Sequence, residues 1–377
     1  MRGGNAAGDL EVRFEGAEIR RLDAGLGREW LLTNGLGGYA SGTVVGMDIR
    51  QYHALLVAAM DPPVRRVALL IRLNEAVTIG EDTTELMTAE YADGTIFPEG
   101  YKHIESFAVE AGLPTWTFRV GDCLLRRTIW MVPGHNITVV RYKLAVGSEP
   151  VGLALRPLCA ARDHRSVERG NGNRRCSVDA VRDGVVVWAG ADRPPLWLLA
   201  PGGAFLPAGD WYWNVLLREE RALGHDHIED LFQPGTFRFT LRPGRSFTFL
   251  ASAEEPGPTF PDPDGALAKR RSAYAHNAVS RPTGRRVDCL SAALAEAADQ
   301  FVVARRSIEA DQSIGTSLIA GYHWFTDYIR DALIALPGLL LANGRVHDAI
   351  ALLRLSAAQV RDGLVPSQFP EQERSPE

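Results

Sequence analysis

Hydrophobic and polar residues alternate over short stretches along the first two thirds of the chain, and Gly, Pro, Asp and Asn separate these stretches. From about Leu10 to Glu255 this pattern is typical of short β-strands, and their spacing favours an antiparallel sandwich over alternating strands and helices. The clearest hairpin pairs 126–130 with 138–143 across a Pro-Gly-His-Asn turn. The pattern predicts strands at 43–47, 54–58, 67–73, 116–120, 124–131, 137–144, 185–189, 237–241 and 246–251.

The composition changes after this region, first to the Pro-rich segment EEPGPTFPDPDG and then to a polar, Arg-rich segment that ends near Arg286. Such segments commonly join domains. We therefore predict a β-sandwich domain at 1–255, a linker at 256–286 and a helical region at 287–377.

Apolar residues at helical spacing predict three helices in the last region. The first follows Asp288, a candidate N-cap, and the second runs from 327 to 341, with Pro337 bending it and Gly344 near its end. The third runs from 346 to 361. Its apolar face is expected to consist of Val346, Ile350, Leu353, Ala357 and Val360.

Composition narrows the class of protein. The 377 residues are 46% hydrophobic and 23% charged, with a formal net charge of -5, which is typical of a globular protein. The acidic balance, without a long basic run, argues against nucleic acid as the main partner. No apolar stretch is long enough for a signal peptide or a membrane span, so we expect a cytoplasmic protein without membrane contact. The four cysteines form no CxxC pair, and no metal or organic cofactor is implied.

The segment Ala320 to Asp331, AGYHWFTDYIRD, is the densest candidate for chemistry. If the helix begins at Asp327, this residue and Asp331 share one helical face, and Arg330 lies beside it. Carboxylates and a guanidinium can hold vicinal hydroxyls, and the flat ring of Trp324 can contact a sugar. The same residues also fit a capping Asp327, a surface pair of Asp331 with Arg330, and a core tryptophan.

Other polar segments are weaker candidates. The glycines in TNGLGGYA (33–40) favour a tight turn between two strands over a phosphate-binding loop, because no helix follows. His53, directly before a predicted strand, is more often a hydrogen-bonded structural residue than a titrating one. The mixed His and carboxylate segments at 162–164 and 225–230 lack the spacing of metal ligands and are expected to be solvated loops.

Five stretches together resemble the glycogen-debranching, amylo-α-1,6-glucosidase type proteins of bacteria and archaea. They are EWLLTNGLGGYASGT (29–43), RQYHALLVAA (50–59), AADQFVVAR (297–305), AGYHWFTDYIRDALIALPGLLLANGR (320–345) and DGLVPSQFP (362–370). The chain departs from the family pattern at Tyr328-Ile329, where an aromatic-Gly pair is usual, and at Gln51 and Ala54.

The resemblance implies a mixed, multidomain fold: an N-terminal antiparallel β-sandwich followed by the first helices of an incomplete (α/α)6 barrel, roughly its first quarter. It also implies that Arg330 and Asp331 bind a glucosyl residue of glycogen or a branched α-glucan, with Trp324 and Asp327 in the same pocket. Further residues of the matching stretches are candidates for lining this cleft: Tyr322, His323, Tyr52, His53 and Asn34.

Hydrolysis of an α-1,6 branch needs a general acid and a second carboxylate on opposite sides of the sugar, about 6.5–9.5 Å apart in inverting enzymes. Asp327 and Asp331, on one wall, cannot form that pair, and the family's acid and base are expected beyond Glu377. We therefore expect this chain to be truncated and inactive alone. Two alternatives remain: a non-catalytic glucan-binding protein, or one chain of a split enzyme whose second chain supplies the rest of the barrel.

Overall fold

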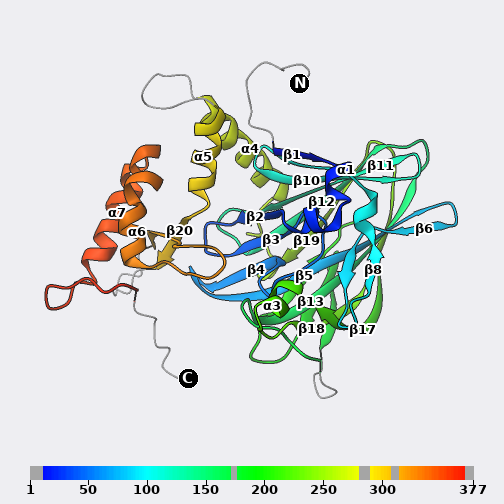
Figure 1. Cartoon of the computed structure of the whole chain (residues 1–377), viewed down its shortest axis with the longest axis horizontal. Coiled ribbons are helices and arrows are strands. Elements are labelled where there is room, and N and C mark those ends of the chain that lie inside the picture. Colours follow the sequence, from blue (N-terminus) through cyan, green and yellow to red (C-terminus); the bar gives the residue numbers. More distant parts are fainter. Residues whose placement is uncertain (1–11, 171–175, 280–288, 307–313, 370–377) are drawn as a thin grey trace.

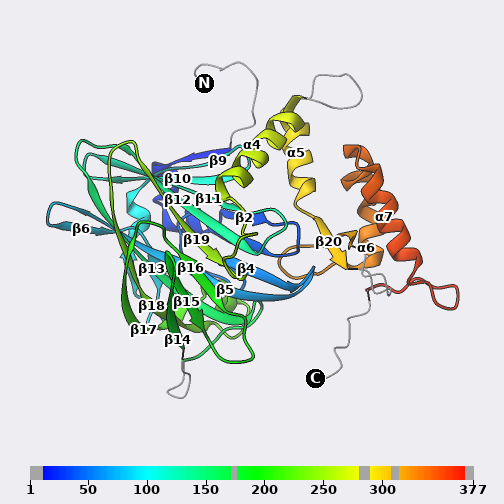
Figure 2. The ribbon, with the colours of Figure 1, turned by 180° about the vertical axis from the view of Figure 1, so that it is seen from behind.

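Two large antiparallel sheets dominate the molecule, with a smaller helical region at one side (Figure 1). The computed structural model describes residues 12–170, 176–279, 289–306 and 314–369. Seen from behind, the helices α5, α6 and α7 again lie beside the sheets, at the side away from β6 and β17 (Figure 2). The protein is therefore mostly antiparallel β-structure, as the alternating pattern predicts.

The first sheet has nine strands in the order β1-β9-β10-β11-β12-β19-β16-β15-β14. In that order they span Val12–Glu15, Ile104–Glu110, Leu113–Val120, Cys123–Met131, Ile137–Val146, Ser246–Ser252, Leu196–Leu199, Gly184–Trp188 and Ser177–Val181.

The second sheet has eight strands, seven of them in the order β17-β18-β13-β5-β4-β3-β2, with β6 paired to β5. They span Ala204–Leu216, Ile228–Leu241, Val151–Asp163, Val64–Ile79, Ala54–Asp61, Tyr39–Thr43, Glu29–Thr33 and, for β6, Asp82–Glu85. The short pair β7 and β8 covers Thr88–Glu90 and Ile96–Glu99, and the short helices α1, α2, η1 and α3 cover Gly16–Ile19, Leu22–Leu26, Gly100–His103 and Arg218–Ala222.

Apolar side chains from both sheets meet in one core. In β11 alternate side chains are buried, as expected for a strand with one face on a core. The core combines Leu56 of β4 with Trp116 of β10 and Tyr142 of β12, all almost fully buried. Burial of such side chains contributes about 1.5–3 kcal/mol each, so this core is the main source of stability in the sandwich.

Most of the predicted strands are present, including the hairpin, in which Arg126 pairs with Lys143 and Trp130 with Val139. The strand predicted at 43–47 is wrong. The chain leaves β3 at Thr43, whose carbonyl accepts a hydrogen bond from the Gly46 N–H in a turn, and Gly46 has a positive φ of 75°. A glycine in this conformation ends a strand without strain.

The segments expected to be solvated loops are so only in part: residues 225 and 226 are exposed as expected, whereas Arg162, His164, Glu229 and Asp230 are buried. Arg162 and Glu229 form an ion pair between β13 and β18, in which Arg162 Nη2 donates to Glu229 Oε2 at 3.0 Å. The carboxylate lies within β18, which continues through Pro234-Gly235 rather than starting after it. Charges buried on neighbouring strands are tolerated because they pair with each other.

The helical region contains four helices among the described residues: α4 (Pro263–Val279), α5 (Cys289–Asp299), α6 (Ile329–Leu339) and α7 (Val346–Ala357). A hairpin of β20 (Val302–Arg306) and β21 (Ile314–Leu318) joins α5 to α6, and the 3-10 turn η2 (Leu341–Asn343) precedes α7. Helix α4 occupies the segment expected to be a linker. The candidate cap Asp288 lies outside the described residues.

Two helix predictions need correction. Helix α6 begins at Ile329 rather than at Asp327, with Pro337 inside it as expected. Helix α7 ends at Ala357, four residues early, and it packs through Leu352 and Leu355 rather than through the predicted face. Leu352 is fully buried whereas the neighbouring Leu353 is 51% exposed. The chain has two apolar faces here, and only one meets the β20–β21 hairpin and α6.

None of the helices in the described part of the chain is long and apolar enough to cross a membrane.

Candidate functional site

The segment between β21 and α6 packs against the sandwich through an aromatic stack. The ring of His323 lies on the ring of Tyr52, with centroids 4.2 Å apart and planes within 14°. Trp324 meets the same tyrosine edge to face at 5.4 Å. His323 Nε2 is 3.0 Å from Ser41 Oγ, so β3 holds the imidazole in place. The structure thus brings Tyr52 together with His323 and Trp324, which lie more than 270 residues after it in the sequence.

His53 supports this stack from inside the sandwich. Its Nδ1 accepts a hydrogen bond from the Ile49 N–H, so a neutral ring carries its proton on Nε2, which lies 3.3 Å from Glu29 Oε2. Partial burial opposes ionisation of Glu29, but hydrogen bonds from His53 and Arg50 outweigh it and lower its pKa to about 2. His53 is therefore a buried, hydrogen-bonded residue, and its ring meets the Tyr52 ring edge to face.

Trp324 is the exposed end of the stack, with 53% of its surface open. Two arginines lie near this stack. Arg165 donates to its carbonyl oxygen at 3.4 Å, and the Arg50 guanidinium lies 5.7 Å from the centre of the Tyr52 ring. Arg50 also pairs with Glu29 at 3.0 Å. A flat apolar ring beside fixed donors and acceptors suits a polyhydroxyl ligand.

Asp327 is buried and does not reach this open surface. Both of its carboxylate oxygens accept hydrogen bonds from Arg305 Nη1, at 2.8 and 2.9 Å, and both side chains are almost fully buried. Burial raises the pKa of Asp327 although Arg305 opposes that shift. The expected helical face shared by Asp327 and Asp331 does not exist, because α6 starts two residues after Asp327. Asp327 fixes the segment to β20 instead.

Arg330 and Asp331 occupy the first turn of α6. The Arg330 side chain is 70% exposed, and its Nη2 lies 3.4 Å from Asp331 Oδ2. Asp331 lines an open groove of about 370 Å³ between α6 and β21, together with Leu318 and Ile334. Within the described residues, no hydrogen bond, ion pair or ring contact joins this pair to Trp324, so the expected four-residue cluster is only partly assembled.

Tyr322 and Asn34 are held by contacts within the protein. The Tyr322 ring meets Tyr39 edge to face at 5.8 Å, and the Arg66 guanidinium lies 5.1 Å from its centre. Asn34 is buried in the turn after β2 and donates to the carbonyl of His135 and to Asn136 Oδ1. It also borders a cleft of about 550 Å³ between the sandwich and the helical region. This turn at 34–38 confirms the tight turn expected from its glycines, two of which have positive φ.

Two residues at this contact were not assigned to it from the sequence. Arg66 had no signal, and its guanidinium lies near the rings of Tyr39 and Tyr322, buried and, within the described part of the chain, without a hydrogen-bond partner. His164 belongs to a segment expected to be a solvated loop, but it packs on Tyr39. Burial lowers the pKa of His164 to about 2 and that of His323 to about 3. Arg305, the partner of Asp327, ends one of the five quoted stretches, which was the only hint of its role.

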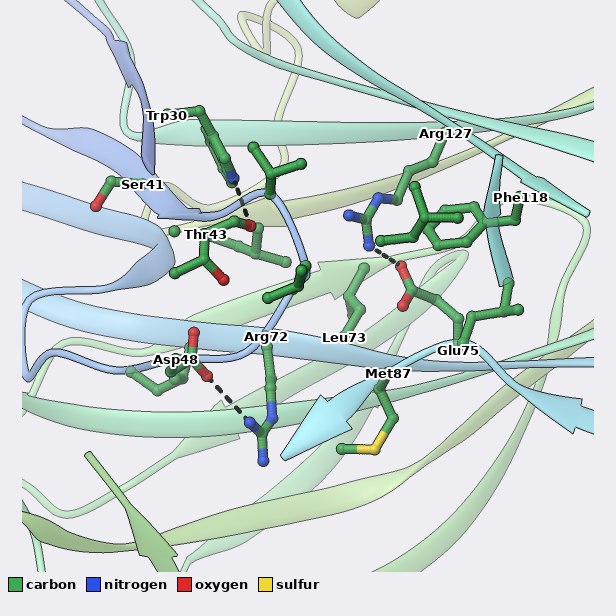
Figure 3. A pocket seen from close by; sticks show the side chains of 18 residues that line it. Trp30, Ser41, Thr43, Asp48, Arg72, Leu73, Glu75, Met87, Phe118 and Arg127 are labelled. Carbon is green, nitrogen blue, oxygen red and sulfur yellow. Dashed lines mark hydrogen bonds and ion pairs between the residues drawn. The ribbon is translucent and has the colours of Figure 1, made fainter. Parts of the chain in front are cut away.

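A separate small cavity of about 40 Å³ lies inside the sandwich (Figure 3). Two ion pairs border it: Arg72 with Asp48 at 3.2 Å, and Arg127 with Glu75 at 2.7 Å. Since one water molecule fills about 30 Å³ of liquid, this space is too small for a sugar ring. It belongs to the core and not to a substrate site.

Comparison with known proteins gives two family matches in chain order. Residues 28–248 match the model described as glycogen debranching enzyme N terminal, and residues 296–377 match amylo-alpha-1,6-glucosidase. No curated protein matches. Similar solved structures include a bacterial glucoamylase complexed with acarbose, at 11% identity and a TM-score of 0.44 over 90% of this chain and 49% of that chain. A polysaccharide lyase gives 16% identity and a TM-score of 0.24 over 49% and 25%. The chain thus spans about half the length of the glucoamylase.

Proposed function

The chain belongs to the glycogen debranching enzyme family, and we propose that it serves the hydrolysis of α-1,6-glucosidic branch linkages in glycogen or a related branched α-glucan. In this proposal the exposed ring of Trp324 contacts a glucosyl residue, and Arg330 and Asp331 bind hydroxyl groups at the start of α6. The contact between the two family-matched segments supports the location. Tyr52 comes from the first segment, whereas His323 and Trp324 come from the second.

The aromatic stack is the observation that carries this proposal. Trp324 is half exposed, so the protein interior does not enclose it. Its ring is nevertheless held in place by the ring of Tyr52, which itself lies on His323. A rigid ring loses little conformational entropy when a ligand arrives, so more of the contact energy appears as affinity.

The helical region is proposed to be the beginning of an (α/α)6 barrel, in a chain divided into 1–255, 256–286 and 287–377. Apolar residues on the outer faces of its helices support this, because Leu294, Ile334 and Leu353 are each more than half exposed. Further helices would cover these faces. A second chain that supplies them is the other candidate, and the same exposed residues favour it.

We expect the 377 residues to bind branched glucan without cleaving it. The two carboxylates of the motif cannot act as the acid and the base, since Asp327 is buried against Arg305 and Asp331 lies beside Arg330 in the turn proposed to bind hydroxyl groups. A two-carboxylate hydrolysis needs acids on opposite sides of the scissile bond. If this is correct, the purified chain releases no glucose from a branched limit dextrin.

The test is retention of the protein in native gels that contain glycogen. Trp324→Ala should weaken binding about tenfold, the effect of one lost tryptophan anchor. Trp188→Ala is the matched control, because Trp188 is also exposed but lies at the end of β15. The proposal is wrong if the unaltered protein is not retained, or if the Trp324 and Trp188 variants behave alike.

A further inference from the structure

A second exposed tryptophan lies on the eight-stranded sheet. Trp213 belongs to β17, the strand at the end of that sheet, and is 49% exposed. It lies near the C-terminal end of β17, where Val215 bridges to Tyr91 and belongs to the same buried cluster as Tyr322. A half-exposed indole on a strand that is paired on both sides is free to contact a ligand through its open face.

The backbone around Trp213 is built to hold it in this position. The pairing of β17 with β18 shifts between Tyr212 and Val215, and Asn214 has a positive φ of 58°. The buried carboxylate of Asp230 accepts hydrogen bonds from the Asn214 N–H at 2.7 Å and from the Gly170 N–H at 2.9 Å. The Asp230 side chain thus fixes both β17, which carries Trp213, and the segment that ends at Gly170.

Gly170 makes room for the indole. A Cβ atom at this glycine would come within 2.5 Å of Trp213 Cζ3, closer than real contacts allow. The Trp213 ring also stacks on Trp211, with centroids 5.7 Å apart and planes within 28°. Trp211 in turn packs on Phe232, a buried core residue. The exposed Trp213 ring is therefore held in place by the close backbone of Gly170 and by the indole of Trp211, which packs on the core.

Hydrogen-bonding groups border the ring. Arg169, whose side chain is 55% exposed, points its Nη1 to Asn214 Oδ1 at 3.4 Å. A flat apolar surface with both donors and acceptors at its edge matches a pyranose ring, which has apolar C–H faces and equatorial hydroxyls. It matches a purely apolar partner poorly, because burial of the polar border would cost free energy.

We propose that Trp213, with Arg169 and Asn214 at its border, is a second and non-catalytic binding site for α-linked glucan chains. This inference rests on the proposed function, which supplies the glucan. A polymer such as glycogen offers many chain ends, so two weak sites on one protein raise the overall affinity by increasing the effective concentration of chain ends.

The experiment uses the whole chain labelled with 5-fluorotryptophan and follows the fluorine resonances during titration with maltoheptaose. Each of the eight tryptophans gives its own signal, which single substitutions assign. We expect saturable shifts at Trp213 that persist in Trp324→Ala, and no shift at Trp188. In glycogen gels, Trp213→Ala should weaken retention about tenfold. Trp213→Phe, which keeps a ring, should recover part of it.

The outcomes separate this inference from the proposed function. Shifts at Trp324 without shifts at Trp213 overturn the second site and leave the proposed function intact. Shifts at neither residue overturn both. Thermal unfolding of Trp213→Ala provides the control for folding, and the fluorine titration of the unsubstituted protein decides the question even if that variant does not fold.

Discussion

Two buried histidines should make the contact between the sandwich and the helical region sensitive to acid. His164 and His323 both pack against Tyr39, with ring centroids at 6.0 and 4.9 Å. Burial lowers their pKa values from 6.5 to about 2 and about 3. Because the folded state binds protons less readily than the unfolded state, their contribution to stability is complete above pH 6.5 and is lost as the pH falls toward 3.

The magnitude follows from these pKa values. At pH 5 the unfolded histidine is about 1.5 pH units below its pKa of 6.5, whereas the folded one stays neutral. Since one pH unit corresponds to about 1.4 kcal/mol, each histidine should remove about 2 kcal/mol from the free energy of unfolding between pH 8 and pH 5. Glu29, whose pKa is lowered from 4.5 to about 2, adds to the loss only below about pH 4.5.

Urea unfolding at pH 8 and pH 5 measures this effect. His323→Gln can still hydrogen-bond to Ser41 but cannot titrate, so its loss of stability between the two pH values should be about 2 kcal/mol smaller than that of the unsubstituted protein. Adding His164→Gln should reduce it by about 4 kcal/mol in total. The reasoning fails if the three proteins lose the same stability to within about 0.5 kcal/mol, since that would mean that the buried rings accept protons normally.

Two further predictions concern the helical region. Leu352→Ala should lower the free energy of unfolding by about 2–5 kcal/mol and Leu353→Ala by less than about 0.5 kcal/mol, because only Leu352 is buried; equal effects in urea unfolding would contradict the packing of α7. Arg305→Met should cost about 3–5 kcal/mol by leaving Asp327 buried without its partner, and adding Asp327→Leu should recover most of it; a double variant no more stable than the single one would refute this pairing.

Local patterns predicted the sandwich well. The β11–β12 hairpin needs only neighbouring residues, so its turn and register follow from the sequence. The same is true of the turn at 34–38, in which Gly35 and Gly37 have positive φ. A second reason for glycine at position 37 comes from a distant residue, because a Cβ there would lie 2.4 Å from the carbonyl oxygen of Pro63. A side chain at Gly37 is excluded on both grounds.

The predictions that were wrong concern residues whose structure depends on partners far away in the sequence. In α7 both Leu352 and Leu353 lie on apolar faces, and only the position of the β20–β21 hairpin and α6 decides which face is buried. Asp327 was placed on a helix by its spacing from Asp331, but Arg305, 22 residues earlier, binds it outside the helix. The contact of Tyr52 with His323 joins residues 271 positions apart and leaves no local pattern.

The most direct test of the central claim is a crystal structure of the chain with a short branched α-glucan oligosaccharide. We expect a glucosyl ring within van der Waals contact of Trp324, with hydroxyl groups bound by Arg330 or Asp331. An oligosaccharide bound elsewhere, with the Trp324 ring still open to solvent, would contradict it.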